Sequence, residues 1–214
     1  MTVLEIDTPH GPARAHLHVA GEPVGALVLG HGAGGGVGAP DLVAVTDVAV
    51  SAGFSVALVE QPYHVAGRRS PAPARQLDAA WTAVVSRLRE SELSGLPLIV
   101  GGRSAGARVA CRTAAEIGAV AVLCLAFPLH APGRAGTGKT RQPELDAVEV
   151  PCLVVQGRRD PFGMPRSSST RTVVKVDGNH GLKTDLDAVS AAVRDWLSGL
   201  RTAADASPPP SPVR

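Results

Sequence analysis

Hydrophobic residues along this chain form short continuous runs, separated by longer stretches with helical spacing. A continuous apolar run of four to eight residues is typical of a strand covered on both faces. Such runs occupy residues 26–29, 54–59, 98–100, 120–127, 152–155 and 172–176. Helical spacing fills most of the gaps, at residues 41–52, 74–90, 104–117 and 184–200. This alternation predicts an α/β fold with a mostly parallel, doubly wound sheet covered by helices on both faces.

The two ends of the chain depart from the alternation. Residues 3–6 and 14–19 predict a hairpin, joined by a turn rich in Pro and Gly. Near the other end, Thr184 is the expected N-cap of the last helix. Residues 202–214, TAADASPPPSPVR, predict a disordered tail. We therefore expect one domain over residues 1–201, without a cap domain because the linkers between elements are short.

Composition excludes several classes of function. The chain has 214 residues, of which 44% are hydrophobic and 19% are charged, with a formal net charge of +2. Two Trp, one Tyr and three Phe are too few and too scattered for a nucleic-acid stacking platform. The longest apolar run, residues 119–127, is about half the length of a membrane span. We expect a small-molecule substrate, with neither nucleic acid nor membrane as partner.

Cysteine usage and the first residues indicate the compartment. The three cysteines, Cys111, Cys124 and Cys152, fall in apolar helix or strand patterns, which favours buried free thiols over a disulfide or a metal site. The beginning of the chain, MTVLEIDTPHG, lacks the basic and then apolar layout of a signal peptide. Both features predict a cytoplasmic protein.

The stretch GGRSAGARVA carries a G-x-S-x-G motif from Gly102 to Gly106. It lies between a short apolar strand and a helical pattern, so Ser104 is expected at a sharp strand-to-helix turn. Small residues must flank such a turn, which lifts the serine hydroxyl above the sheet as a nucleophile. The alternative is an ordinary helix N-cap in a tight glycine loop. The motif alone does not separate the two, because the chain contains 24 glycines.

A serine nucleophile needs a base and an acid that orients the base. Asp160, in QGRRDPFG, follows the apolar run at 152–155, and His180, in VDGNHGLK, follows the run at 172–176. The order Ser, Asp, His is the one expected when these residues sit at the carboxyl ends of successive strands. Alternatively, Asp160 is a turn residue before a proline and His180 a surface loop residue. With Ser104, the two predict a catalytic triad.

A glycine-rich loop follows the first parallel strand, in LGHGAGGG. The backbone N–H groups of Ala33 and Ala105 are expected to converge above Ser104 and to bind an oxyanion. His31 is expected to hold the loop through hydrogen bonds. A dinucleotide site is the alternative, although the G-x-G-x-x-G layout is absent.

Basic residues near the same edge of the sheet are candidate ligands for an acidic group of the substrate. These are Arg68, Arg69 and Arg103, with a solvated or structural role as the alternative.

The stretch GRAGTGKT, Gly133 to Thr140, matches the pattern of a phosphate-binding loop. Such a loop must follow a strand closely and open a helix. Here Pro128 and Pro132 intervene before it, and Pro143 falls where the first helical turn should be. We expect a basic loop at the rim of the site instead of a nucleotide site.

The chain resembles the α/β-hydrolase superfamily, in six blocks that occur in order over roughly residues 20–200: LGHGAGG, EQPYHVAGRRSPAP, GGRSAGARVA, PLHAPG, VVQGRRDPFG and DGNHGLK. It looks like the small, lidless dienelactone-hydrolase-like branch. Within that branch it is similar to the group named after testis-expressed protein 30 and a subunit of a histone acetyltransferase complex. The resemblance implies an eight-stranded-type sheet, a triad of Ser104, Asp160 and His180, and an oxyanion loop at Ala33.

The residues and the resemblance together predict a serine hydrolase that cleaves a small ester or thioester without a metal or organic cofactor. The alternative is a catalytically silent scaffold of the same fold that binds a protein partner. One departure from the family concerns the segment between Asp160 and His180, where MPRSSSTR offers little helix, so the crossover there is expected to be a loop.

Overall fold

The fold is seen in a computed structural model, which describes residues 1–131, 133 and 140–205. In this part of the chain one sheet contains eight strands in the order β1-β2-β4-β3-β5-β6-β7-β8. Their bounds are Thr2–Ile6 (β1), Ala13–His18 (β2), Gly25–Gly30 (β3), Phe54–Glu60 (β4), Leu98–Arg103 (β5), Ala121–Leu125 (β6), Cys152–Gly157 (β7) and Arg171–Val176 (β8). Strand β2 pairs antiparallel with β1 and β4, and all other neighbours are parallel. The expected mostly parallel sheet is confirmed.

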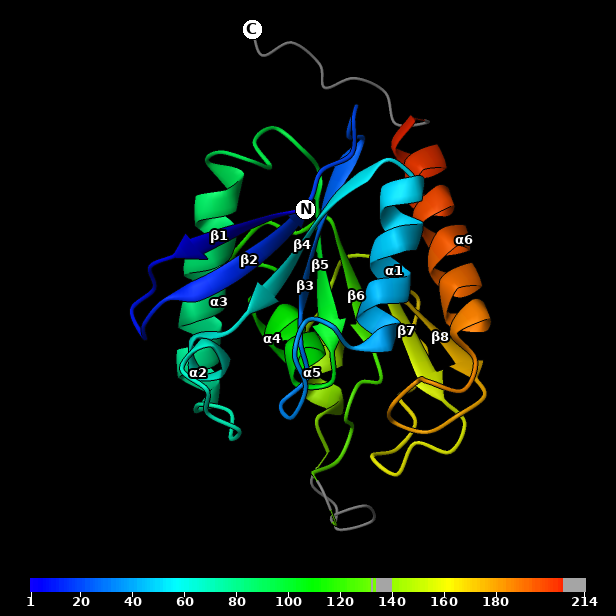
Figure 1. The fold of residues 1–214 in the computed structure, drawn as a ribbon. Helices are drawn as coiled ribbons and strands as arrows, with labels where there is room; N and C mark the ends of the chain where they lie inside the picture. The colour runs from blue at the N-terminus through cyan, green and yellow to red at the C-terminus, as the bar shows by residue number, and fades with distance from the viewer. Residues whose placement is uncertain (132, 134–139, 206–214) are drawn as a thin grey trace, which may run out of the picture.

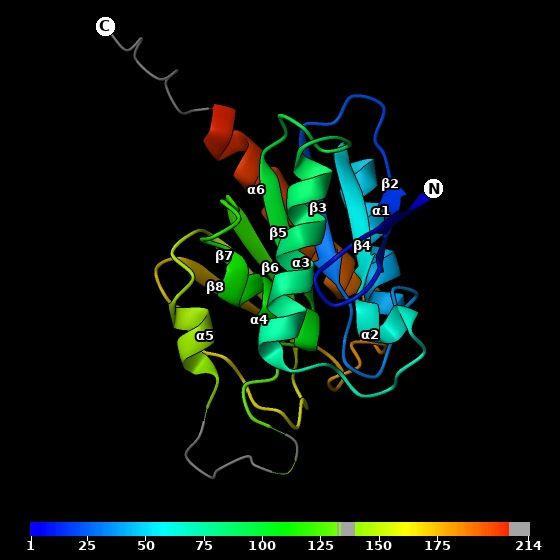
Figure 2. The same ribbon diagram turned by 90° about the vertical axis from the view of Figure 1, so that its left-hand side faces the viewer.

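Helices cover both faces of this sheet (Figures 1 and 2). Their bounds are Pro40–Ser51 (α1), Pro62–Val65 (α2), Ala74–Arg89 (α3), Ala105–Thr113 (α4), Gln142–Asp146 (α5) and Leu186–Asp205 (α6). Helices α1 and α6 lie side by side on one face, and α3 and α4 lie on the other. The doubly wound arrangement expected from the apolar pattern is therefore present, and no cap domain is seen over the described residues.

The hydrophobic core consists of two clusters, one on each side of the sheet. The α3–α4 side contains Trp81 and Phe127, the largest fully buried side chains, and the α1–α6 side contains Leu27, Leu29 and Leu123. Every residue of β3, β6 and β7 is buried, which explains why these strands show continuous apolar runs instead of alternation. Burial of each large apolar side chain contributes about 1.5–3 kcal/mol to folding.

Helix α6 differs from the sequence prediction at both ends. The Oδ1 of Asp185, not the hydroxyl of Thr184, accepts a hydrogen bond from the amide of Ala188, at 3.0 Å, so Asp185 is the N-cap. The helix continues to Asp205, so residues 202–205 do not belong to the expected tail. Thr202 bonds through its hydroxyl to the carbonyl of Ser198, at 3.1 Å, and the alanines that follow favour helix. The remainder of the expected tail lies outside the described residues.

Two short helices, α2 and α5, have no strong periodic signal in the sequence. Helix α5 begins at Gln142 and accommodates Pro143 in its first turn, where a missing N–H costs nothing. Pro143 is therefore compatible with a helix, contrary to the reasoning from sequence. The segment from Asp160 to β8 contains no helix, which agrees with the expected loop crossover. Among the described residues, none of the helices is both long and apolar enough to cross a membrane.

Candidate active site

The serine of the G-x-S-x-G motif lies at a strained turn between β5 and α4. Ser104 has φ 53° and ψ −106°, a conformation rare for any residue with a side chain. Its amide donates to the carbonyl of Leu125, at 2.9 Å, which anchors the turn to β6. A Cβ atom at Gly102 or Gly106 would overlap with the carbonyl oxygen of Gly30. Only glycine at both positions allows β3 and α4 to approach this closely.

The three residues expected to form a triad lie within hydrogen-bonding distance in the expected order. The hydroxyl of Ser104 donates to Nε2 of His180, at 2.9 Å, and Nδ1–H of His180 donates to Oδ2 of Asp160, at 2.8 Å. The side chain of Asp160 is fully buried, and that of His180 is 18% exposed. A buried carboxylate on Nδ1 leaves Nε2 free to accept a proton from Ser104.

Asp160 is held by donors on both carboxylate oxygens. The amide of Phe162 donates to Oδ1, at 2.8 Å, and Nε2 of Gln156 donates to Oδ2, at 2.8 Å. Gln156 also contacts the carbonyls of Phe127, at 3.1 Å, and Gly163, at 2.9 Å. Sequence reasoning missed Gln156. Its signal was a polar residue directly after the apolar run at 152–155, and the structure buries this residue completely at the end of β7.

The loop that carries His180 is supported from two sides. The ring of Phe162 packs edge-on against the imidazole, with ring centroids 4.3 Å apart. Nη2 of Arg103 donates to the carbonyl of His180, at 3.1 Å, and Nε of Arg103 forms an ion pair with Oδ2 of Asp41, at 2.9 Å. Burial raises the pKa of Asp41, and Arg103 opposes that effect. Arg103 thereby connects the first turn of α1 to the loop that carries His180.

The glycine-rich loop after β3 is fixed by hydrogen bonds to the segment after β4. Nδ1–H of His31 donates to the carbonyl of Gly32, at 2.8 Å, and Nε2 of His31 accepts from the amide of Gln61, at 3.1 Å. The hydroxyl of Tyr63 donates to the carbonyl of Ala33, at 3.1 Å. Burial lowers the pKa of His31, which keeps the ring neutral and able to accept at Nε2. His31 thus makes the loop contacts expected of it.

Ser104 and His180 open onto a cleft of about 920 Å³, which Ala33 and Ala105 also line. The two candidate oxyanion residues therefore lie on the same cavity as the candidate nucleophile. Arg103 lines this cleft as well. In contrast, Arg68 and Arg69 line a separate hollow of about 350 Å³ beside Ala33. Substrate binding by these arginines stays a prediction, and the position of the pair at 68 and 69 does not favour it.

Two alternative sites from the sequence were a nucleotide loop and a metal site. Most of the stretch from Gly133 to Thr140 lies outside the described residues, so the prediction of a basic rim loop falls outside them too. Within residues 1–131, 133 and 140–205, no group of three His, Cys, Asp or Glu side chains could hold a metal ion.

Comparison with known proteins gives a family match and a set of similar folds. The family model described as "Alpha/beta hydrolase domain" matches residues 23–193. No curated protein matches the chain. Among solved structures, Est1E from Butyrivibrio proteoclasticus has a TM-score of 0.78 at 16% identity, covering 94% of this chain and 100% of its own.

Two further structures have the same fold. XC6422 from Xanthomonas campestris, described as an α/β serine hydrolase without a lid, has a TM-score of 0.73 at 20% identity, with 97% of this chain and 96% of that one covered. A dienelactone hydrolase from Anabaena variabilis has a TM-score of 0.74 at 17% identity, with 92% of this chain and 96% of that one covered. These likenesses cover nearly the whole chain and concern the fold.

Proposed function

Because the chain belongs to the alpha/beta hydrolase family, we propose that it is a serine esterase that cleaves a small ester or thioester. The observation that carries this proposal is the continuous series of hydrogen bonds from Ser104 through His180 to the buried Asp160, at 2.9 and 2.8 Å. A series of this kind activates a serine hydroxyl, which is a weak nucleophile on its own. The open cleft and the absence of a cap over the described residues favour a small substrate.

In the proposed reaction, Oγ of Ser104 attacks the carbonyl carbon of the ester while Nε2 of His180 takes the hydroxyl proton. Asp160 stabilises the imidazolium that forms. The negative charge on the former carbonyl oxygen is bound by the amides of Ala33 and Ala105. Nε2–H then protonates the departing alcohol or thiol, which leaves an acyl group on Ser104. Water, deprotonated by His180, attacks the acyl group and restores the serine.

Two findings on the relatives agree with this proposal. XC6422 is described as a serine hydrolase without a lid, and the Anabaena protein is described as a dienelactone hydrolase. For the present chain we propose activity on ester bonds and a cytoplasmic location. We also propose its place in the group named after testis-expressed protein 30, on the six sequence blocks described above.

The decisive experiment is labelling of the folded protein with a fluorophosphonate probe, with Ser104→Ala as the control. We expect labelling of the wild type and none of the variant. A panel of nitrophenyl esters of increasing chain length would then define the acyl preference, with kcat for Ser104→Ala reduced by a factor of 10³ or more.

Absence of labelling in correctly folded wild-type protein would reject the esterase proposal and leave the catalytically silent scaffold as the better explanation. Equal labelling of Ser104→Ala would show that another group reacts with the probe.

A further inference from the structure

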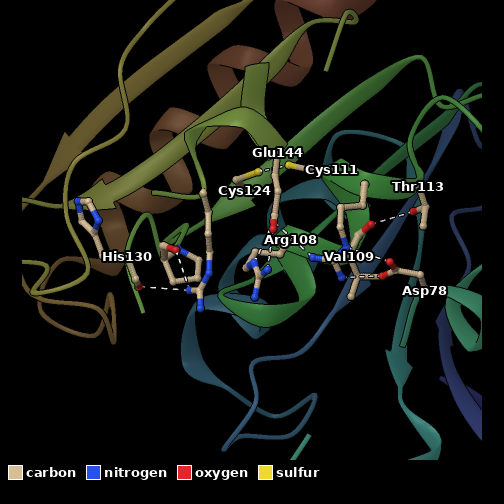
Figure 3. A network of polar contacts seen from close by, with 11 residues as sticks. Asp78, Arg108, Val109, Cys111, Thr113, Cys124, His130 and Glu144 are labelled. Atoms are coloured by element: carbon tan, nitrogen blue, oxygen red, sulfur yellow. Dashed lines mark hydrogen bonds and ion pairs between the residues drawn. The ribbon is translucent and has the colours of Figure 1, made fainter. Parts of the chain in front are cut away.

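One wall of the cleft contains arginines from α4 and from the residues just before α5. Figure 3 shows Arg108 of this wall together with Asp78 and Glu144. Arg108, one helical turn after Ser104, forms a two-pronged ion pair with Glu144 on α5, at 2.8 and 2.6 Å. Arg112, one turn further, forms a similar pair with Asp78 on α3, at 2.9 and 2.6 Å, and also reaches Glu144, at 3.3 Å. These pairs hold the guanidinium groups of α4 in place.

Arg141 lies beside these pairs but has no carboxylate of its own. Its Nη1 donates to the backbone carbonyls of Pro128, at 3.0 Å, and His130, at 3.2 Å. No carboxylate of the described residues lies within 4.0 Å of the guanidinium. Residues 132–139 contain neither Asp nor Glu. Burial, and then the charge of Arg108, lower the pKa of Arg141, although a guanidinium stays protonated at neutral pH.

The charges around the cleft are unequal. Among the described residues that line it, the basic ones are Arg103, Arg108, Arg112, Arg141 and Lys183, and none is acidic. The carboxylates that pair with them are Asp41, Asp78 and Glu144, which approach from outside the lining. The described part of the cleft thus has more basic side chains than carboxylates to pair with them. Arg141 is half-buried and belongs to the basic side chains that have no carboxylate partner. Partial burial strengthens its attraction for an anion, because less water screens it.

We propose that this wall is an anion subsite, in which Arg141 binds the anion and Arg108 lies beside it. The preferred substrate is then an ester that also carries a carboxylate group. The inference rests on the esterase function proposed above. A guanidinium presents N–H donors in the planar arrangement that a carboxylate accepts. Nη1 of Arg141 is engaged by carbonyls that hold the group in place without neutralising it. One uncompensated guanidinium on this wall matches a single negative charge.

The test compares charged and neutral esters of matched size. The first set uses mono-4-nitrophenyl esters of linear dicarboxylic acids, which carry the anion in the acyl part. The second set uses 4-acetoxybenzoate, which carries the anion in the alcohol part. Their neutral partners are the corresponding methyl esters. We expect the wild type to prefer the charged member of at least one set in kcat/KM. We also expect added NaCl to reduce this preference.

The variants assign the preference to Arg141. In Arg141→Gln the ratio of charged to neutral kcat/KM should fall roughly tenfold to a hundredfold, mainly through KM, as for the loss of a charge-assisted hydrogen bond. Arg141→Lys should retain part of the preference. The matched control is Arg194→Gln, which removes the same charge from an exposed position of α6 outside the cleft lining. Its ratio should equal that of the wild type. Circular dichroism and thermal melting establish that each variant is folded.

Three results would overturn the inference: no preference in the wild type, an unchanged ratio in Arg141→Gln, or equal losses for both members of a set, which would show a merely structural role. If the fluorophosphonate probe does not label Ser104, the esterase proposal fails separately. Titration calorimetry with glutarate then tests the subsite alone. Weaker binding to Arg141→Gln than to Arg194→Gln would support the subsite, and absence of binding to the wild type would reject it.

Discussion

Ser104 and His31 show how single side chains at this site depend on the backbone around them. Ser104 occupies a positive φ that costs free energy, and the neighbouring strands offset that cost through its bond to Leu125. His31 is buried near Ser104 and lies outside the hydrogen-bonded series of Ser104, His180 and Asp160. Its two ring nitrogens instead join the loop of Gly32 to the segment at Gln61. The candidate site thus contains one histidine within the proposed triad and another that supports the loop.

The burial of His31 predicts a pH dependence of stability. Its pKa in the folded state lies below the ordinary value of 6.5, so the unfolded chain binds a proton more readily. The stabilisation that results is fully present above pH 6.5 and is lost as the pH falls below that value. We expect the free energy of unfolding to fall by at most about 1.4 kcal/mol per pH unit from this group. Urea unfolding from about pH 8 to pH 5 measures it.

The comparison variant is His31→Gln, which cannot titrate and should show a shallower dependence on pH. His10→Gln, which changes an exposed histidine between β1 and β2, should keep the slope of the wild type. Parallel curves for the wild type and His31→Gln would contradict the prediction. Glu60 and His64 also act on the pKa of His31, and both side chains are unchanged in the variant.

At the scale of elements, the site depends on how closely β3, β5 and α4 pack. Gly106, in the first turn of α4, lies against the backbone of Gly30 and His31, and the position offers no room for a side chain. This contact places the N-terminus of α4 beneath the glycine-rich loop. The closeness of strand and helix is therefore a requirement of the candidate oxyanion site as well as of the core.

We expect Gly106→Ala to lower the free energy of unfolding by about 1–3 kcal/mol, because its Cβ forces the backbone of β3 and α4 apart. Fluorophosphonate labelling of Ser104 should slow in parallel. The control is Gly199→Ala in α6, where an added Cβ meets no atom within 4 Å. That change should raise stability by up to about 1 kcal/mol, because alanine favours helix over glycine. Urea unfolding compares the two, and a Gly106→Ala protein as stable as the wild type would contradict the packing argument.

Over the whole molecule, the two helical layers shield the sheet from solvent. The cysteines illustrate this, since Cys111, Cys124 and Cys152 are 4%, 0% and 1% exposed. They lie on α4, β6 and β7, and the sulfurs of Cys111 and Cys124 are 3.5 Å apart (Figure 3). Hydrogen bonding to Cys111 and Cys152, together with burial, raises the pKa of Cys124 well above its ordinary value. The expected buried free thiols are therefore present in the structure.

These thiols report on global unfolding. We expect the native protein to react with dithionitrobenzoate only on the timescale of unfolding, and all three cysteines to react at once in guanidinium chloride. The same thiol count with and without prior reduction would verify that no disulfide forms. Rapid reaction of the native protein would contradict the burial of this cluster.

The sequence by itself determined the α/β class, the order of the long elements and the three residues of the candidate triad. These follow from local signals, because apolar spacing reports the burial of each element and strand order brings the carboxyl ends of parallel strands to one edge. The sequence did not predict short helices such as α5, since one helical turn carries too little periodicity. The end of α6 was also predicted too early, because helix propensity persists into the alanines before the proline-rich segment.

Only the tertiary structure decided which polar side chains support the site and which face the cleft. Gln156, near the end of β7, reaches Asp160 in the turn that follows the strand, but Arg103 meets Asp41 and Arg108 meets Glu144 across long stretches of chain. Such pairs depend on the packing of α1, α4 and α5 against the sheet, which no local pattern encodes. For the same reason the sequence singled out Arg68 and Arg69, whereas the fold brings Arg141 to the cleft. Charge at a site is set by which partners the fold supplies.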